Sequence, residues 1–148
     1  MRAHNGRENV TVIRRLAAPA DAVFAAWTQP ALLRRWAVDA ASNDPRVGGY
    51  FRQETRAADG LHVVSGEYRE FVPNRRLVMT WNHQGPSSAG DKTETLVTVD
   101  LRESGSEATE LVVTEEPVAS HEREDATAAW TGALDPLEAL LADPSRPT

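Results

Sequence analysis

The chain has 148 residues, with 16 Lys+Arg against 22 Asp+Glu, and its net charge of −6 argues against general nucleic-acid binding. It contains no cysteine, which excludes disulfides, thiolate metal sites and cysteine nucleophiles. With 41% hydrophobic and 26% charged residues, the composition is that of an ordinary globular protein, and we expect a single domain over 1–148 with an ordered core at about 9–142.

The first nine residues, MRAHNGREN, are polar. A secretory signal would need an apolar stretch of ~7–15 residues after its basic start, and none follows. No window reaches the ~18 consecutive apolar residues of a membrane helix. We therefore expect a cytoplasmic protein without a membrane span.

One strand and two short helices are predicted at the start of the chain. Residues 9–16 (NVTVIRRL) supply the strand. Pro19 suits a first helical turn, and Pro30 ends that helix and begins another. The apolar faces of the two helices are Val23, Phe24 and Trp27, then Leu32, Leu33 and Trp36.

Five further strands are predicted where side chains alternate with a period of two. They lie at 47–56, 62–72, 76–83, 93–102 and 108–115. The connections are short and carry turn residues such as Asp59-Gly60 and Pro73-Asn74. Because a parallel crossover needs about a dozen residues or more, the strands form an antiparallel meander.

A long amphipathic helix is predicted near the C-terminus, beginning after Pro117. Its apolar residues recur every three or four positions, at Ala126, Trp130, Leu134, Leu137 and Leu141. This helix is the segment long enough to cover the apolar face of the sheet. The fold class is therefore α+β, with a curved antiparallel sheet wrapped around the long helix and a cavity between them.

Four segments resemble a known family: APADAVFAAWTQPALLRRW (18–36), RVGGYF (46–51), GEYREFVPNRRLVMTW (66–81) and WTGALDPLEAL (130–140). They are similar to the AHSA1 (activator of Hsp90 ATPase homologue 1-like) branch of the SRPBCC, or START/Bet v 1-like, superfamily. The resemblance implies a helix-grip fold with an internal cavity that binds lipids, hormones, polyketides or other apolar molecules in different members. Some relatives are cyclases or hydroxylase subunits, and one branch stimulates the ATPase of Hsp90.

Two features depart from the family pattern. The chaperone activators carry an additional N-terminal domain, and nothing in this sequence corresponds to it. Many bacterial members have paired tryptophans at the end of the second helix, whereas here Trp36 is followed by Ala37. We therefore do not expect Hsp90 as a partner.

Strand phase predicts which side chains face the cavity, because neighbouring residues of a strand point to opposite faces. On 62–72 we place the phase of Tyr68 and Val72 inward and Phe71 outward. On 76–83 we place Val78 and Thr80 outward. The predicted ligand-binding set is Trp36, Phe51, Gln53, Val64, Tyr68, Met79, Trp81, His83, Val97, Val99, Leu111, Val113, Glu115 and Trp130. The alternative is that these side chains are plain core.

Most kinds of catalytic chemistry lack a motif in this sequence. The histidines show no HxH or HxxxH spacing, so a metal site formed by His62, His83 and Glu115 is not expected. There is no G-x-S-x-G elbow, and Gly48-Gly49 lacks the other glycines of a phosphate-binding loop. We expect neither a metal nor a cofactor.

General acid–base chemistry remains open. His83 and Glu115 could exchange a proton with a bound polyphenol or enol, and Tyr68 could donate a hydrogen bond to its oxygen. These three residues are the catalytic candidates if there is turnover.

The sequence thus favours binding of a hydrophobic or aromatic small molecule in the internal cavity. The alternative is a cofactor-free cyclase or dehydratase acting on a polyketide-like substrate, and a chaperone regulator comes third. An exposed strand edge or the long helix would also allow a homodimer.

Overall fold

The computed structural model describes residues 7–86 and 93–142, and within them seven strands form one sheet in the order β1-β7-β6-β5-β4-β3-β2. Every neighbouring pair of strands is antiparallel. The strands are β1 (Arg7–Leu16), β2 (Ala40–Asn43), β3 (Tyr50–Ala57), β4 (Gly60–Val72), β5 (Arg76–Gln84), β6 (Thr93–Glu103) and β7 (Thr109–Ala119). The helices are α1 (Ala20–Thr28), α2 (Pro30–Trp36), the 3-10 turn η2 (Ser120–Glu122) and α3 (Arg123–Ala142).

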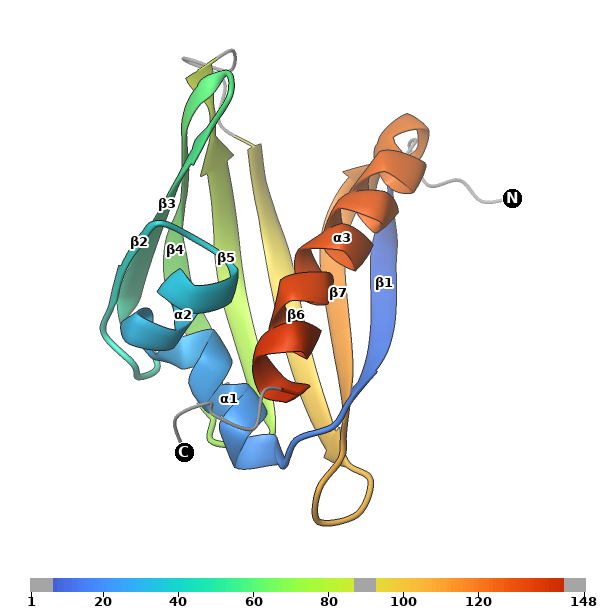
Figure 1. Ribbon diagram of the computed structural model, residues 1–148. Helices are drawn as coiled ribbons and strands as arrows, with labels where there is room; N and C mark the ends of the chain where they lie inside the picture. Colours follow the sequence, from blue (N-terminus) through green and yellow to red (C-terminus); the bar gives the residue numbers. More distant parts are fainter. Residues whose placement is uncertain (1–6, 87–92, 143–148) are drawn as a thin grey trace.

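The long helix α3 lies across the concave side of the sheet, in front of β6, β7 and β1, and α1 and α2 lie near its C-terminal end (Figure 1). This arrangement confirms the predicted α+β helix-grip fold, with two short helices after the first strand and a meander before the long helix. The meander forms because each connection between β3 and β7 is too short for a crossover.

The prediction was wrong about two stretches of the chain. It missed β2, which pairs with β3, because the four residues AASN are too few to show an alternation. It also placed the start of the long helix too early, since β7 continues through Pro117 and α3 begins only at Arg123. A register shift in β1 between Glu8 and Val10 lies opposite Pro117. Strands tolerate proline at such irregularities.

The predicted phase of β4 was wrong in its last third. The pairing of β4 with β5 shifts register between Tyr68 and Glu70, which is a bulge that adds one residue to one strand. Beyond the bulge Phe71 points inward, and its ring centroid lies 5.3 Å from that of Phe24. Val72, predicted to face inward, is 41% exposed. The bulge reverses the alternation, as an extra residue must when side chains alternate with a period of two.

The outer face of β5 is covered more closely than predicted. Val78 and Thr80 were placed on the solvent side, yet both are buried. Thr80 Oγ1 accepts a hydrogen bond from the backbone N–H of Glu67 at 2.8 Å. A Cβ on Gly66 would collide with the carbonyl oxygen of Thr80. The two strands therefore approach closely at Gly66 and Thr80.

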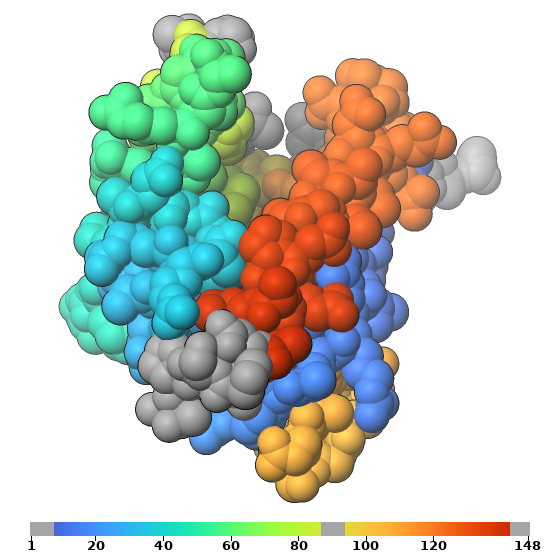
Figure 2. All heavy atoms as spheres, in the orientation of Figure 1, coloured from blue at the N-terminus to red at the C-terminus, as the bar shows by residue number. Residues whose placement is uncertain are grey.

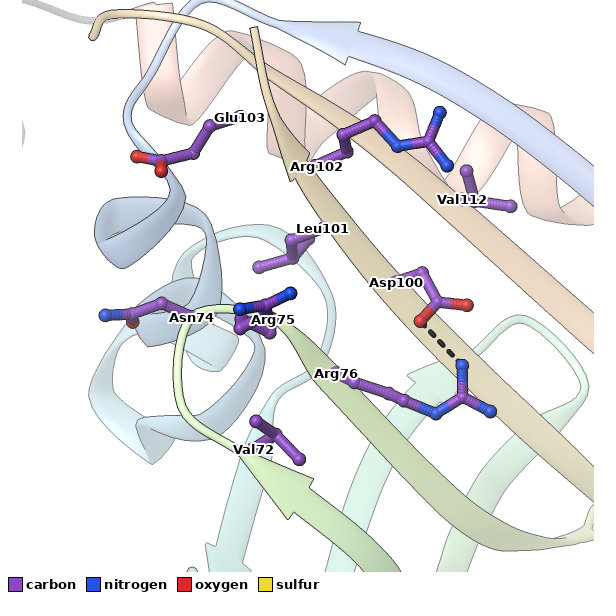
Figure 3. A pocket seen from close by; sticks show the side chains of 9 residues that line it. All are labelled: Val72, Asn74, Arg75, Arg76, Asp100, Leu101, Arg102, Glu103 and Val112. Carbon is purple, nitrogen blue, oxygen red and sulfur yellow. Dashed lines mark hydrogen bonds and ion pairs between the residues drawn. The ribbon is translucent and has the colours of Figure 1, made fainter. Parts of the chain in front are cut away.

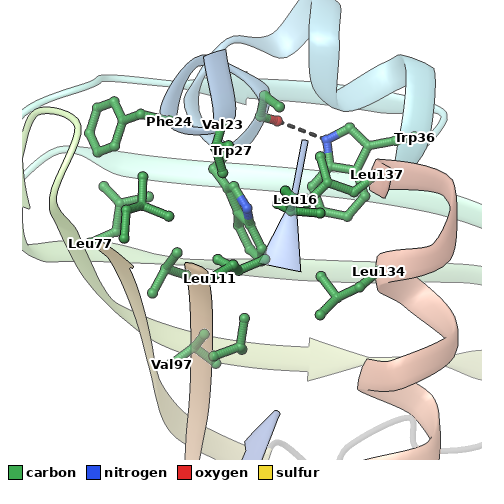
Figure 4. Packing of buried hydrophobic residues seen from close by; sticks show 14 of the residues in the cluster. Leu16, Val23, Phe24, Trp27, Trp36, Leu77, Val97, Leu111, Leu134 and Leu137 are labelled. Carbon is green, nitrogen blue, oxygen red and sulfur yellow. Dashed lines mark hydrogen bonds between the residues drawn. The ribbon is translucent and has the colours of Figure 1, made fainter. Parts of the chain in front are cut away.

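The hydrophobic core lies between α1, α2, the second half of α3 and the sheet (Figure 4). Leu134 and Leu137 of α3 are fully buried there, as are Leu16 and Leu111 on the sheet. Trp36 closes the core beneath α2, and its indole N–H donates to the carbonyl oxygen of Ala26 at 2.8 Å. Side chains thus fill the space between the sheet and the buried leucines Leu134 and Leu137 of α3.

Arg14 fixes the position of α3 on the sheet. Its side chain is on the inward phase of β1, and only 17% of it is exposed. The guanidinium donates to Asp135 at 3.1 Å, to Glu138 at 2.8 Å and to the carbonyl oxygen of Thr131 at 2.9 Å. Because these three acceptors are on one helix, Arg14 holds the middle of α3 against the edge strand.

Candidate functional site

A cleft of about 480 Å³ lies under the N-terminal half of α3. The surface of the molecule is hollowed between the β3–β4 hairpin and the first turns of α3 (Figure 2). The strands supply four lining residues, and the helix supplies four more. They are Trp81, His83, Thr95, Glu115, Ala126, Ala129, Trp130 and Ala133.

The sequence of α3 explains why a hollow forms at this end of the helix. The positions that face the sheet in the second half are Leu134, Leu137 and Leu141, and all three are buried. The residues that α3 contributes to the cleft are alanines, apart from Trp130. An alanine side chain has three heavy atoms fewer than a leucine side chain, so α3 leaves space beside its alanines, whereas its leucines fill the space above the sheet.

Glu115 fastens both walls of the cleft together. Its Oε1 accepts a hydrogen bond from the indole N–H of Trp130, and its Oε2 accepts one from the hydroxyl of Thr95, both at 2.8 Å. The carboxylate therefore links α3 to β6 and β7. Because each of its oxygens already accepts a hydrogen bond, the main role of Glu115 is to orient Trp130.

Aromatic rings continue from the cleft into the core. The ring centroids of Trp81 and Trp130 are 5.6 Å apart, at an interplanar angle of 47°. Trp81 also packs against Phe51 at 5.9 Å, and Trp130 stacks on Trp27 at 6.4 Å. Such contacts hold large rings in fixed orientations. The two indoles of the cleft are thus braced from behind by buried aromatic residues.

His83 lies at the mouth of the cleft and is hydrogen-bonded away from it. Its Nε2 is 3.0 Å from Nδ1 of His62, and Nε2 of His62 is 2.8 Å from Oδ1 of Asp59. Partial burial, followed by the neighbouring His62, lowers the pKa of His83 from its usual 6.5. The hydrogen bond from His62 lowers the pKa of Asp59.

The structure does not bring Tyr68 together with His83 and Glu115. Tyr68 is 2% exposed, and its hydroxyl accepts a hydrogen bond from the side-chain amide of Asn43 at 3.0 Å. Burial raises its pKa, although the bond from Asn43 opposes this. Tyr68 is a member of the core and not of the cleft lining.

The predicted ligand-binding set divides into residues that line the cleft and residues that are buried in the core. Trp81, His83, Glu115 and Trp130 line the cleft. The larger part of the set is buried in the core, namely Trp36, Phe51, Met79, Val97, Val99, Leu111 and Val113. Gln53 and Val64 are half-buried on adjacent strands, paired with each other.

Sequence reasoning left out of the site five residues that the structure places at or beside it. Thr95 lies on the predicted strand at 93–102 but is not in the predicted set, and Asp59 is predicted only as a turn residue. The three alanines of α3 also line the cleft. Their spacing of three and four residues from one another, on the face that carries Trp130, is the signal that could have identified them.

A second hollow, of about 830 Å³, lies mainly on the outer face of β5 and β6 (Figure 3). Arg76 dominates it and pairs with Asp100 at 2.8 Å and with Glu70 at 3.1 Å. The hydrogen bond that Arg76 donates to Asp100 contributes most to raising the pKa of Arg76. Because the arginine is already engaged by two carboxylates, this hollow is a weaker candidate for a ligand than the cleft.

Residues 7–86 and 93–142 contain no group of three or more metal-ligating side chains placed to hold an ion. Nor does that part of the chain contain a helix that is both long and apolar enough to cross a membrane.

The sequence from residue 17 to 142 matches the family model described as "Activator of Hsp90 ATPase homolog 1-like protein", AHSA1. The chain belongs to this family. A comparison with curated proteins gives no match.

Solved structures share the AHSA1 fold of this chain. CalU16 from Micromonospora echinospora is 26% identical, with a TM-score of 0.72 over 93% of this chain and 78% of its own. The Mll3558 protein from Rhizobium loti is 28% identical, with a TM-score of 0.74 over 90% of this chain and 96% of its own. DynU16, a protein in the dynemicin biosynthetic locus, is 26% identical, with a TM-score of 0.77. That match covers 94% of this chain and 49% of DynU16.

Proposed function

We propose that the cleft under the first half of α3 binds a hydrophobic or aromatic small molecule. The observation that carries this proposal is the lining: two indoles, Trp81 and Trp130, and three alanines border an open space of about 480 Å³. Ligand sites commonly measure ~300–1,000 Å³ and combine an apolar wall with a few polar groups. Thr95, Glu115 and His83 are the polar groups here.

The two indoles favour a flat ring system over an aliphatic chain. They are tilted by 47° to one another and held by buried neighbours, so each can offer a face or an edge without reorganising. Aromatic pairs in these geometries contribute ~0.5–1.5 kcal/mol beyond the area that they bury. An aromatic ligand would gain this from both tryptophans.

The comparisons support a small-molecule role. DynU16, at 26% identity, is a protein of a biosynthetic locus, which fits a natural-product ligand of polyketide-like character. The Hsp90 activity in the family's name is not carried over, because the fold alone does not transfer a function. A cofactor-free cyclase or dehydratase is the second candidate, and the observation that favours it is the position of His83 at the cleft mouth.

Filling the cleft tests the proposal. Ala129→Leu places a branched side chain in the lining, and Ala128→Leu places the same side chain on an exposed position of the same helix outside the lining. Binding is measured by titrating each protein with anilinonaphthalene sulfonate, following tryptophan quenching and the fluorescence of the probe. We expect saturable binding by the natural protein and by Ala128→Leu, and weaker binding by Ala129→Leu.

Equal affinity of both leucine variants, with unchanged circular dichroism, would contradict a binding site in the cleft. Native mass spectrometry of the protein purified from its own host gives a second readout, since a molecule retained by the natural protein should be missing from Ala129→Leu.

A further inference from the structure

Three polar side chains form a chain that ends at the mouth of the cleft. Asp59 lies in the turn between β3 and β4, and His62 lies near the start of β4. Gly60, at φ +129°, begins β4 in a backbone conformation that favours glycine. His62 then contacts His83 of β5, with the two rings within 13° of parallel. His83 is the only member of the three that lines the cleft.

The carboxylate of Asp59 determines which ring nitrogen of each histidine carries the proton. Asp59 accepts from Nε2–H of His62, so a neutral His62 has its lone pair on Nδ1. That lone pair accepts the Nε2–H of His83. A neutral His83 therefore carries its own lone pair on Nδ1, and within residues 7–86 and 93–142 no other hydrogen bond reaches its ring.

We propose that Asp59, His62 and His83 form a relay of hydrogen bonds in which Nδ1 of His83 is a general base for an aromatic ligand that carries an acidic C–H or O–H bond. This inference rests on the binding proposed above and adds chemistry to it. His83 is the catalytic residue, because it faces the ligand space. His62 and Asp59 are positioning residues, because they act on the ligand through His83.

The proton and electrons balance without a further reactant. Nδ1 of His83 takes the proton from the ligand, and the electron pair of the broken bond stays on the ligand as an enolate or phenolate. The imidazolium keeps its Nε2–H bond to His62, which in turn donates to the Asp59 carboxylate, as in other carboxylate-oriented histidines. The proton then returns to another atom of the same molecule, or it leaves with a hydroxyl group as water.

The charges around His83 suit a base that is neutral before it acts. His62 on β4 opposes its protonation, whereas Glu115 on β7 and Asp59 in the turn favour it. The lining residues of α3 are alanines and Trp130, which carry no charge. Partial burial is the largest influence and holds the pKa of His83 below 6.5, so at neutral pH the lone pair is available.

Base-promoted ring opening of nitrobenzisoxazole, an aromatic C–H acid, tests the relay. The base removes the ring C–H proton, the N–O bond breaks with its electrons going to oxygen, and the coloured cyanonitrophenolate is followed by absorbance. General base catalysis contributes ~100-fold or more, so we expect a loss of about that size in His83→Ala. His121→Ala, an exposed histidine outside the cleft lining, should keep the natural rate.

Variants that disturb the positioning residues should lose less of the reaction rate than His83→Ala, and Asp59→Asn should also change its pH dependence. Asp59→Asn removes a negative charge that favours protonation of His83, so the rise of rate with pH should move to lower pH and reach a lower plateau. Gly85→Ala leaves every titrating group in place, yet its Cβ would lie 3.0 Å from Nδ1 and Cε1 of His62. Nδ1 of His62 is the atom hydrogen-bonded to His83, so the reaction rate of this variant should also be lower.

The outcomes separate the relay from ligand binding. Binding of nitrobenzisoxazole is measured by tryptophan quenching in the same samples. A natural rate in His83→Ala, or a pH profile unmoved by Asp59→Asn, overturns the relay. So does a ¹⁵N spectrum at neutral pH that shows the Nδ1–H form of His83. If the natural protein binds nitrobenzisoxazole without turnover, the relay is overturned and the binding proposal stands. If it does not bind the compound, both proposals are overturned.

Discussion

Replacing Trp130 by phenylalanine tests whether Glu115 holds α3 over the cleft. The change keeps an aromatic ring and removes the N–H that donates to Glu115 Oε1 at 2.8 Å. Hydrogen bonds to charged groups contribute ~1.5–3 kcal/mol when buried. Both partners here are half-buried, and water can replace part of the bond. We therefore expect the free energy of unfolding to fall by about 1–2 kcal/mol.

Urea unfolding of four proteins isolates this bond: the natural chain, Trp130→Phe, Glu115→Met and the double variant. In the Glu115→Met background the indole N–H has lost its carboxylate, so Trp130→Phe should cost little more there than its change of ring size. The expected coupling energy is about 1–2 kcal/mol. A loss of this size in the free energy of unfolding would lower the melting temperature of Trp130→Phe by roughly 2–8 °C relative to the natural chain. A coupling below ~0.5 kcal/mol, the usual limit of additivity, would refute the clamp.

Two further predictions use glycine and pH. Gly66→Ala should strongly destabilise the protein, since its Cβ would collide with the backbone of Thr80. Gly132→Ala meets nothing within 4 Å on α3 and should stabilise it by up to ~1 kcal/mol. Urea midpoints compare the two, and equal effects would contradict the strand contact. The lowered pKa of His83 means that the unfolded chain binds the proton at higher pH than the folded protein. Stability should therefore fall as the pH drops below 6.5, less so in His83→Ala. An unchanged slope in that variant would contradict the assignment.

The fold was predictable because its signals are local. Strand periods, short turns and the leucine repeat of α3 each fix an element, and the short connections leave few topologies. The errors occur where pairing between strands overrides the local pattern. The bulge after Tyr68 reverses the phase of Phe71 and Val72, and it depends on how β4 pairs with β5. A single strand sequence does not contain that information.

The site was less predictable, because facing inward and lining a cleft are different properties. Val97 and Trp81 share the inward side of the sheet, yet Val97 is fully buried and Trp81 borders the cleft. Val97 belongs to the buried cluster that contains Leu134 and Leu137, whereas Trp81 borders the open space beside the alanines of α3. The contact between His62 and His83 likewise joins positions 21 residues apart in sequence. No spacing rule identifies it.

The leucines and the alanines of α3 are constrained by folding to different degrees. Leu134 and Leu137 are fully buried, and truncating such residues typically costs ~2–5 kcal/mol, so their identities are constrained by folding. Ala129 and Ala133 face open space, and a larger side chain there displaces no core atom. Enlarging the alanine half therefore reshapes the cleft without disturbing the leucine half. If the cleft binds a ligand as proposed, a few helix positions that folding leaves free set its ligand preference.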